Sequence, residues 1–139
     1  MHPLVDRVAT TNVPIAELIG FQAETAGSGQ AIASFDAGPQ HANPMGTLHG
    51  GVLCDVADMA MGMAFASTLA PDESFTTMSL TINFFRPVRR AHLRAEARVI
   101  NRSRNIGYLE CEVIDEKGKS IAKATSTCMV LRGEQAKAR

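Results

Sequence analysis

HANPMGTLHGGVLCDVADMAMGMAFAST, residues 41–68, is the stretch of sequence that decides the fold. Its first part contains Pro44 and Gly46, which interrupt regular structure and therefore predict a loop. From His49 onward the pattern predicts one helix of about eighteen residues. Because apolar side chains occur on nearly every side of it, this helix is expected to lie inside the protein.

Two acids, Asp55 and Asp58, interrupt the apolar helix. Removing a carboxylate from water costs several kcal/mol unless the group is paired or hydrogen-bonded, so both acids need an explanation. Asp58 is the stronger candidate for chemistry, since partial burial could raise its pKa toward that of a useful base. For Asp55 we favour a hydrogen bond to the loop or to a partner subunit.

The whole chain has 139 residues, which predicts a single domain, with residues 133–139 as a flexible tail. Fourteen basic residues balance fourteen acidic ones, so the charge gives no argument for a nucleic-acid or membrane partner. The N-terminus lacks the pattern of a signal peptide, and the long helix is too short and too rich in Gly and Ala for a membrane span. The cysteines are odd in number and widely spaced, which predicts reduced thiols in a cytoplasmic protein: Cys54, Cys111 and Cys128.

The segments around the long helix predict one more helix and several strands. A short helix is expected at 13–19, capped by Asn12 and stopped by Gly20. Two short strands at 21–26 and 30–35 flank a glycine-containing hairpin turn. Four longer strands are expected after the helix, at 75–84, 93–99, 108–114 and 120–131.

The first of the longer strands alternates between apolar and polar residues. One face is expected to carry Met78, Leu80, Ile82 and Phe84, and the other Thr77, Ser79, Thr81 and Asn83. Together the elements predict an α+β fold, in which one antiparallel sheet wraps around the central helix. One sheet cannot enclose the helix, so a second copy is expected to cover its remaining face at small residues: Ala57, Ala60, Gly62 and Ala64.

The loop and the helix start form a recognisable motif, followed by Asp58 and later by the sequence INFFRP. The motif has the form HxxN-x-x-G-x-x-HGG, with its first spacing one residue tighter here, and consists of His41, Asn43, Gly46, His49, Gly50 and Gly51. The order resembles that of hotdog-fold acyl-CoA thioesterases of the phenylacetate-pathway (PaaI) type. The likeness runs from the first helix to Leu131.

The resemblance implies hydrolysis of acyl-CoA thioesters, without a metal or redox cofactor, at the interface of a homodimer or homotetramer. By the same resemblance Asp58 is the catalytic carboxylate, acting as a general base or as a nucleophile. The backbone N–H of Gly50 polarises the thioester carbonyl, Asn43 lies near the reacting group, and the Thr77 hydroxyl helps to position water.

Elementary chemistry agrees with this assignment for the helix start. The first N–H groups of a helix lack intrahelical partners and lie at the positive end of its dipole, where a developing oxyanion is stabilised. Glycines at Gly50 and Gly51 also permit close approach of a substrate. His49 could orient the loop or touch the substrate, or it could cap the helix, and the sequence leaves these roles open.

Other residues with reactive side chains give weaker grounds for a catalytic thiol or a metal site. His41 is expected to be a loop residue, and Cys54 an inert buried thiol. Together with the two aspartates, His41 and His49 match no common helical zinc pattern, so no metal site is predicted.

Coenzyme A carries phosphates, so basic residues are expected near the mouth of the site. Two groups of arginines are candidates: Arg86, Arg89 and Arg90 near Pro87, and Arg102 and Arg104 in a turn between strands. Two further functions stay open beside the thioesterase. One is a hotdog dehydratase or hydratase that uses His41 and Asp55 as base and acid, and the other is a non-catalytic sensor of acyl-CoA.

Overall fold

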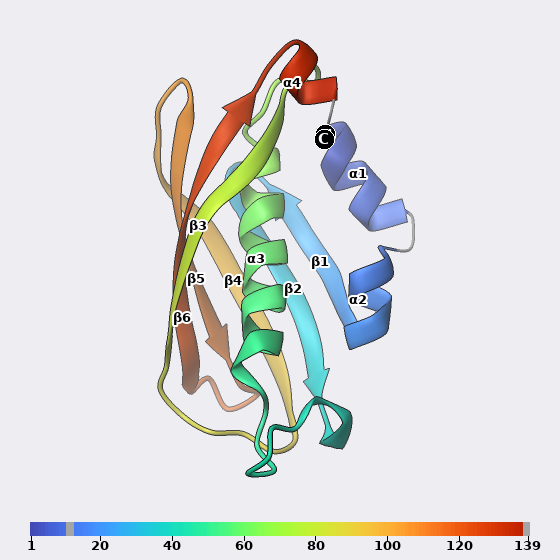
Figure 1. Ribbon diagram of the computed structural model, residues 1–139, viewed down its shortest axis with the longest axis vertical. Coiled ribbons are helices and arrows are strands. Elements are labelled where there is room, and N and C mark those ends of the chain that lie inside the picture. The colour runs from blue at the N-terminus through green and yellow to red at the C-terminus, as the bar shows by residue number, and fades with distance from the viewer. Residues whose placement is uncertain (11–12, 138–139) are drawn as a thin grey trace.

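The computed structural model describes residues 1–10 and 13–137 and has a curved antiparallel sheet around one long helix (Figure 1). The helix is α3 (Gly50–Ala66), and the six strands lie in the order β1-β2-β4-β5-β6-β3. The strands are β1 (Phe21–Gly27), β2 (Gln30–Ala37), β3 (Ser74–Phe84), β4 (Ala91–Arg102), β5 (Ile106–Ile114) and β6 (Ser120–Leu131). The short helices are α1 (Pro3–Thr10), α2 (Pro14–Ile19), η1 (Pro39–His41) and α4 (Glu134–Lys137). This arrangement confirms the predicted α+β architecture.

The N-terminal region contains one element more than the sequence predicted, because α1 precedes the expected short helix. That expected helix is α2, which begins at Pro14 with Val13 in the capping position. The predicted cap, Asn12, lies outside the described residues. Gly20 ends α2 with φ at 95°, a left-handed conformation that glycine adopts readily, as predicted.

Helix α3 turns one side toward the sheet and leaves the other open. Three small residues predicted to face a second copy are fully buried among the core residues of the sheet, and that prediction is therefore wrong: Ala57, Ala60 and Ala64. Their small size lets the helix lie close to the strands. Gly62, the fourth predicted contact, is half-buried beside the Phe75 ring of β3. The open side carries Gly51, Asp55 and Asp58.

Strand β3 contains a β-bulge between Thr77 and Ser79 where it pairs with β6. The extra residue, Met78, shifts the alternation of side chains by one position. Thr77 therefore faces α3, on the same side as Leu80, whereas the sequence predicted opposite faces for these two residues. Bulges often re-aim a side chain next to an active site, and here the bulge directs the Thr77 hydroxyl toward the helix.

The remaining predictions concern the thiols and the end of the chain. The three cysteines carry free thiols, as expected. Residues 133–139, expected to be a flexible tail, include the single helical turn of α4 up to Lys137. Within the described ranges, the helices are all too short or too polar to cross a membrane.

Candidate active site

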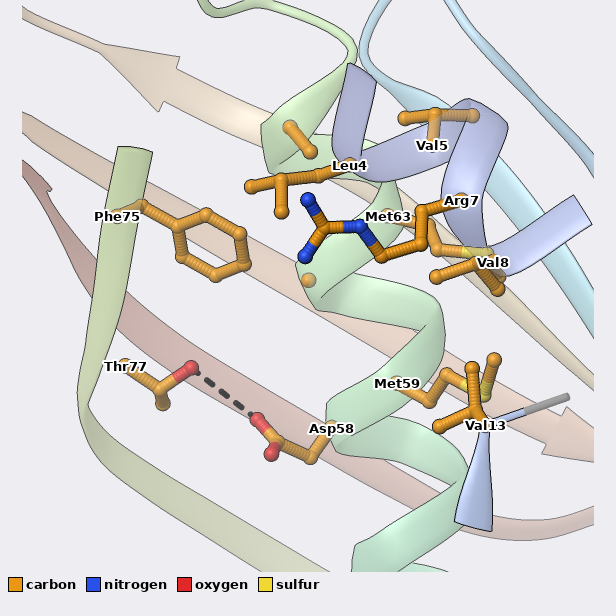
Figure 2. Close-up of a pocket in the computed structure, with 12 residues that line it drawn as sticks. Leu4, Val5, Arg7, Val8, Val13, Asp58, Met59, Met63, Phe75 and Thr77 are labelled. Carbon is orange, nitrogen blue, oxygen red and sulfur yellow. Dashed lines mark hydrogen bonds between the residues drawn. The ribbon is translucent and has the colours of Figure 1, made fainter. Parts of the chain in front are cut away.

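The carboxylate of Asp58 lies on the open side of α3, opposite strand β3. Oγ1 of Thr77 donates a hydrogen bond to Oδ1 of Asp58 at 3.2 Å (Figure 2). The same hydroxyl lies 3.8 Å from Sγ of Cys128 on β6. The structure thus brings together two of the residues that the sequence predicted to be catalytic.

Two hollows meet at Asp58 and Thr77. One is a cavity of about 280 Å³ between α1, α3 and β3, with mostly apolar walls. The other is an open groove of about 390 Å³ between α3 and the bulged part of β3, lined by Asp55, Met78 and Leu80 among others. A molecule that occupies both hollows would pass directly over the Asp58 carboxylate.

Burial raises the pKa of the Asp58 carboxyl above its ordinary value of 3.8. The hydrogen bond from Thr77 lowers this pKa, and the charge of Asp55 raises it further, with a net upward shift. A carboxylate with a raised pKa is a better proton acceptor. The pKa of the neighbouring Cys54 thiol is raised as well, by burial and then by the two aspartates, which favours the unreactive thiol over the nucleophilic thiolate.

The start of α3 is shaped by His49, Gly50 and Gly51. His49 is the N-cap residue, and its Nδ1 accepts a hydrogen bond from the Gly51 N–H at 2.9 Å. The structure therefore shows the capping role that the sequence left open. Gly50 is the first helical residue, so its N–H has no partner within the helix. A Cβ at Gly50 would lie 2.6 Å from the Phe84 ring, so that exposed side chain would have to shift to admit any other residue.

Gly50 and Asp58 are separated by two turns of the same helix, a rise of about 12 Å. An oxyanion donor must lie about 3 Å from the carbonyl oxygen, and a base must lie about 3 Å from the attacking water. Within one chain, the two predicted groups are therefore too far apart to act on the same thioester.

The side chain of Asn43 holds the loop before α3 together. Its Oδ1 accepts hydrogen bonds from the N–H groups of Met45 at 3.0 Å and Thr47 at 3.1 Å, and its Nδ2 donates to Oγ1 of Thr47 at 2.9 Å. Asn43 does not line either hollow beside Asp58. The single chain thus does not bring this predicted residue to the carboxylate.

His41 is buried, and both of its ring nitrogens are engaged. Nδ1 accepts a hydrogen bond from the Gly38 N–H at 3.1 Å, so Nε2 carries the proton and donates to the carbonyl of Ile19 at 2.7 Å. The ring also packs edge-on against Phe35. His41 is the last residue of η1 and not a loop residue, but its role is structural as expected. Its engaged ring is not available as the base that a dehydratase would pair with Asp55.

One of the two predicted arginine groups lies at the end of the sheet where α3 begins (Figure 1). Arg86 and Arg90 line a hollow of about 330 Å³ together with Lys117 and Lys119 from the β5–β6 turn. Asp115 belongs to the same hollow, and its carboxylate accepts the backbone N–H groups of both lysines. These lysines lie beside the arginines because β3, which precedes Arg86, pairs with β6, and β4, which follows Arg90, pairs with β5. The sequence by itself did not single out the lysines, since these pairings join segments that are far apart in the chain.

The third arginine of this group, Arg89, joins the β3–β4 connection to the loop before α3. Its Nη1 donates a hydrogen bond to the carbonyl of Gly46 at 3.0 Å. The other group lies at the opposite end of the sheet, where the Arg102 guanidinium stands over the Phe65 ring at 5.0 Å and donates to the carbonyl of Arg104 at 3.3 Å. Arg102 therefore serves the turn and the end of α3, far from the helix start.

A family model described as the thioesterase superfamily matches residues 45–122, which include the helix start, Asp58 and Thr77. The chain belongs to the thioesterase superfamily. The resemblance stated from the loop motif is thereby confirmed, and so is the predicted enzyme class, a thioester hydrolase.

Three known proteins show the breadth of similarity to this thioesterase. The structure of conserved protein PA5202 from Pseudomonas aeruginosa is 30% identical with a TM-score of 0.81, covering 86% of this chain and 95% of that one. A variant of the phenylacetic acid degradation protein PaaI from Thermus thermophilus is 29% identical with a TM-score of 0.78, covering 84% and 98%. The 1,4-dihydroxy-2-naphthoyl-CoA hydrolase of Listeria monocytogenes is 24% identical over 116 residues, covering 84% of this chain and 94% of that one. These likenesses support the hotdog fold and acyl-CoA thioester hydrolysis at the level of the family.

Proposed function

We propose that this thioesterase hydrolyses acyl-CoA at a site shared by two copies of the chain, with Asp58 and Thr77 from one copy and Gly50 from the other. The observation that carries this proposal is the rise of about 12 Å between Gly50 and Asp58 on one helix. Both groups suit thioester hydrolysis, yet they can meet at one carbonyl only if a second helix supplies one of them.

The sheet offers a way to form such a pair. Strand β3 is at the edge of the sheet, where unpaired backbone groups are available to another strand. Its exposed apolar side chains add surface to bury: Met78, Phe84 and the following Phe85. A homodimer through β3 would be isologous, and a tetramer would require a second interface.

Antiparallel pairing of two β3 strands would also bring the two parts of the site together. Along one chain, α3 runs opposite to β3, so that Gly50 lies beside Phe84 while Asp58 lies beside Thr77. A two-fold axis near Leu80, in the middle of β3, exchanges these ends. The helix start of the partner would then lie level with Thr77 and Asp58 of the first copy.

In the proposed reaction, Asp58 either takes a proton from water as the water oxygen bonds to the carbonyl carbon, or attacks that carbon itself and is released by water. Thr77 holds the carboxylate through its hydrogen bond. The partner's helix start donates an N–H to the carbonyl oxygen as it gains charge. In the base route the carbon–sulfur bond then breaks, and the thiolate of coenzyme A takes up the proton that Asp58 holds. In the nucleophile route this bond breaks as Asp58 forms an anhydride with the acyl group, and the water that later releases Asp58 supplies the proton to the thiolate.

The phosphates of coenzyme A would bind in the basic hollow formed by Arg86, Arg90, Lys117 and Lys119, beside Arg89. This hollow is at the same end of the chain as Gly50, so the nucleotide and the carbonyl oxygen would contact the same copy. Arg102 and Arg104 lie at the far end and are not part of this proposal. Hydrolysis would need no cofactor besides coenzyme A, and the free thiols suit a reducing cytoplasmic compartment.

Mixed dimers test the shared site. Chains with Asp58→Asn are co-expressed with chains carrying Gly50→Pro, which removes the N–H, and thiol release from acyl-CoA is measured. A shared site predicts recovery of about a quarter of the wild-type rate, since about half of the dimers are mixed and each has one intact site. A site within one chain predicts no recovery.

A different result is expected for the wild-type protein if it is an acyl-CoA sensor and not an enzyme. It would bind octanoyl-CoA in a calorimetric titration and release no thiol at any enzyme concentration. Turnover that is lost in Asp58→Asn while binding is kept supports the thioesterase.

A further inference from the structure

We propose that α1 is the outer wall of the acyl-binding cavity and limits the substrate to an uncharged acyl group of up to about ten carbon atoms. This inference rests on the proposed function, because it places the acyl group in the cavity beside Asp58. Leu4 and Val8 of α1 form one side of this cavity, facing Met63 of α3 and Phe75 of β3 (Figure 2).

Helix α1 is fixed to the rest of the fold at its N-terminal end. Nδ1 of His2 accepts a hydrogen bond from the Leu4 N–H at 3.1 Å, so Nε2 donates to the carbonyl of Glu73 at 2.9 Å, just before β3. His2 is buried, and Val5 is buried within the core cluster. The wall is therefore part of the packed structure, and its side chains can select among acyl groups.

The dimensions of the cavity set the length of the acyl group. The cavity follows α3 from Asp58 to Ala66, a rise of about 12 Å. An extended chain advances about 3.5 Å for every three bonds, so about ten bonds span this distance. A dry cavity of about 150 Å³ holds one benzene ring, and the 280 Å³ found here is roughly twice that volume. A medium-length chain or one ring with a short chain fits, and a long fatty acyl chain does not.

The walls also select against charge at the far end of the acyl group. Beyond Asp58 and Thr77 the walls are formed, apart from Arg7, by aliphatic side chains and the Phe75 ring, which cannot solvate a second carboxylate by themselves. Arg7 is the one basic residue among the described lining residues, and its side chain extends across the cavity from α1 (Figure 2). An acyl group with a terminal carboxylate would be preferred only if the Arg7 guanidinium formed an ion pair with that carboxylate.

The experiment measures kcat/KM for a series of acyl-CoA substrates from acetyl to palmitoyl in Leu4→Ala and Leu4→Trp. Leu4→Ala enlarges the cavity, so we expect the ratio of dodecanoyl-CoA to hexanoyl-CoA turnover to rise about tenfold or more. Leu4→Trp fills the cavity, so kcat/KM should fall for octanoyl-CoA and longer substrates, while kcat/KM for acetyl-CoA stays unchanged. The matched control is Leu18→Ala, the same truncation at an exposed position on α2.

Each outcome decides the inference. An identical chain-length profile in all three variants overturns it, as does palmitoyl-CoA turnover equal to that of octanoyl-CoA. Adipoyl-CoA turned over faster than hexanoyl-CoA overturns the assignment to an uncharged group. If the wild-type protein hydrolyses none of the substrates, the proposed function fails by itself. Calorimetric titration of the same acyl-CoA series into the Leu4 variants then tests the cavity wall directly, with the same shifts expected in Kd.

Discussion

The start of α3 and its middle differ in almost every property, although both were assigned to one catalytic site. The start is polar and exposed, is capped by His49, and lies beside a basic hollow. The middle presents Asp58, with Asp55 one turn before it, between an apolar cavity and a bulged strand. In the proposed shared site, each chain therefore contributes two complementary half-sites, one suited to a carbonyl oxygen and phosphates and the other to an acyl group and its attack.

Substitution of Asp58, in the half-site that carries the carboxylate, should have the largest effect on activity. Asp58→Asn removes the proposed base or nucleophile, and we expect kcat to fall about 10²- to 10⁴-fold, measured by thiol release from octanoyl-CoA. The melting temperature at pH 7 should stay equal or rise. Burial raises the pKa of Asp58, so the ionised form slightly destabilises the folded state above that pKa, and asparagine removes this cost; the effect is small because water screens the exposed part of the carboxylate. The rise in melting temperature should vanish below pH 3.8, where the Asp58 carboxyl of the wild type is protonated in both the folded and the unfolded state. Activity lost together with a drop in melting temperature would instead indicate misfolding.

Loss of the Gly50 N–H, in the half-site at the helix start, should have the second largest effect on activity. Gly50→Pro removes the N–H, and proline is well tolerated at the first position of a helix. His49 already has an extended conformation, with ψ at 130°, which suits a residue before proline. Loss of one oxyanion donor is expected to lower kcat about 10²- to 10³-fold relative to Gly50→Ala. The alanine variant is the matched control, since both substitutions add a Cβ against Phe84 and only one removes the N–H. Equal kcat values in the two variants would exclude the amide as a donor.

Thr77 should have a smaller effect, visible in the pH profile. Its hydrogen bond lowers the pKa of Asp58, so Thr77→Val should raise that pKa and move the acid limb of the kcat profile to higher pH. The plateau should fall by about two- to tenfold, as expected for one hydrogen bond. Thr77→Ser keeps the hydroxyl and should retain the wild-type profile. An unshifted limb in Thr77→Val would show that this hydroxyl does not contact the reactive acid.

The sequence was most informative where one pattern covers a long segment. The apolar run of α3 predicted a buried helix, and the alternation after it predicted long strands, because burial imposes these periods on helices and strands. The glycines beside His49 located the helix start. These local signals were enough for the architecture and for placing Asp58 on the buried helix.

The features that failed depend on neighbours in space. The bulge at Met78 reverses the direction of Thr77, and only pairing with β6 reveals it. The alanines of α3 face the sheet because their small size suits close packing, which a helix that is apolar on all sides does not indicate by itself. Helix α1 has an apolar side that includes Leu4, Val5 and Val8, but its eight residues are too few for periodicity alone to identify it, and it supplies a wall of the cavity.

The smallest expected effect distinguishes the two acids of the open side. Asp55 is three residues before Asp58, and its negative charge raises the pKa of Asp58. Asp55→Asn should therefore move the acid limb of the kcat profile to lower pH and leave the plateau unchanged, whereas Asp55→Glu, which keeps the charge, should leave both unchanged. If Asp55 were the reactive acid instead, the plateau would fall by about 10²- to 10⁴-fold, as expected for loss of a general base. A full pH profile of both variants separates these outcomes, because a charge acting at a distance changes where the carboxyl titrates, and a missing base changes the rate at every pH.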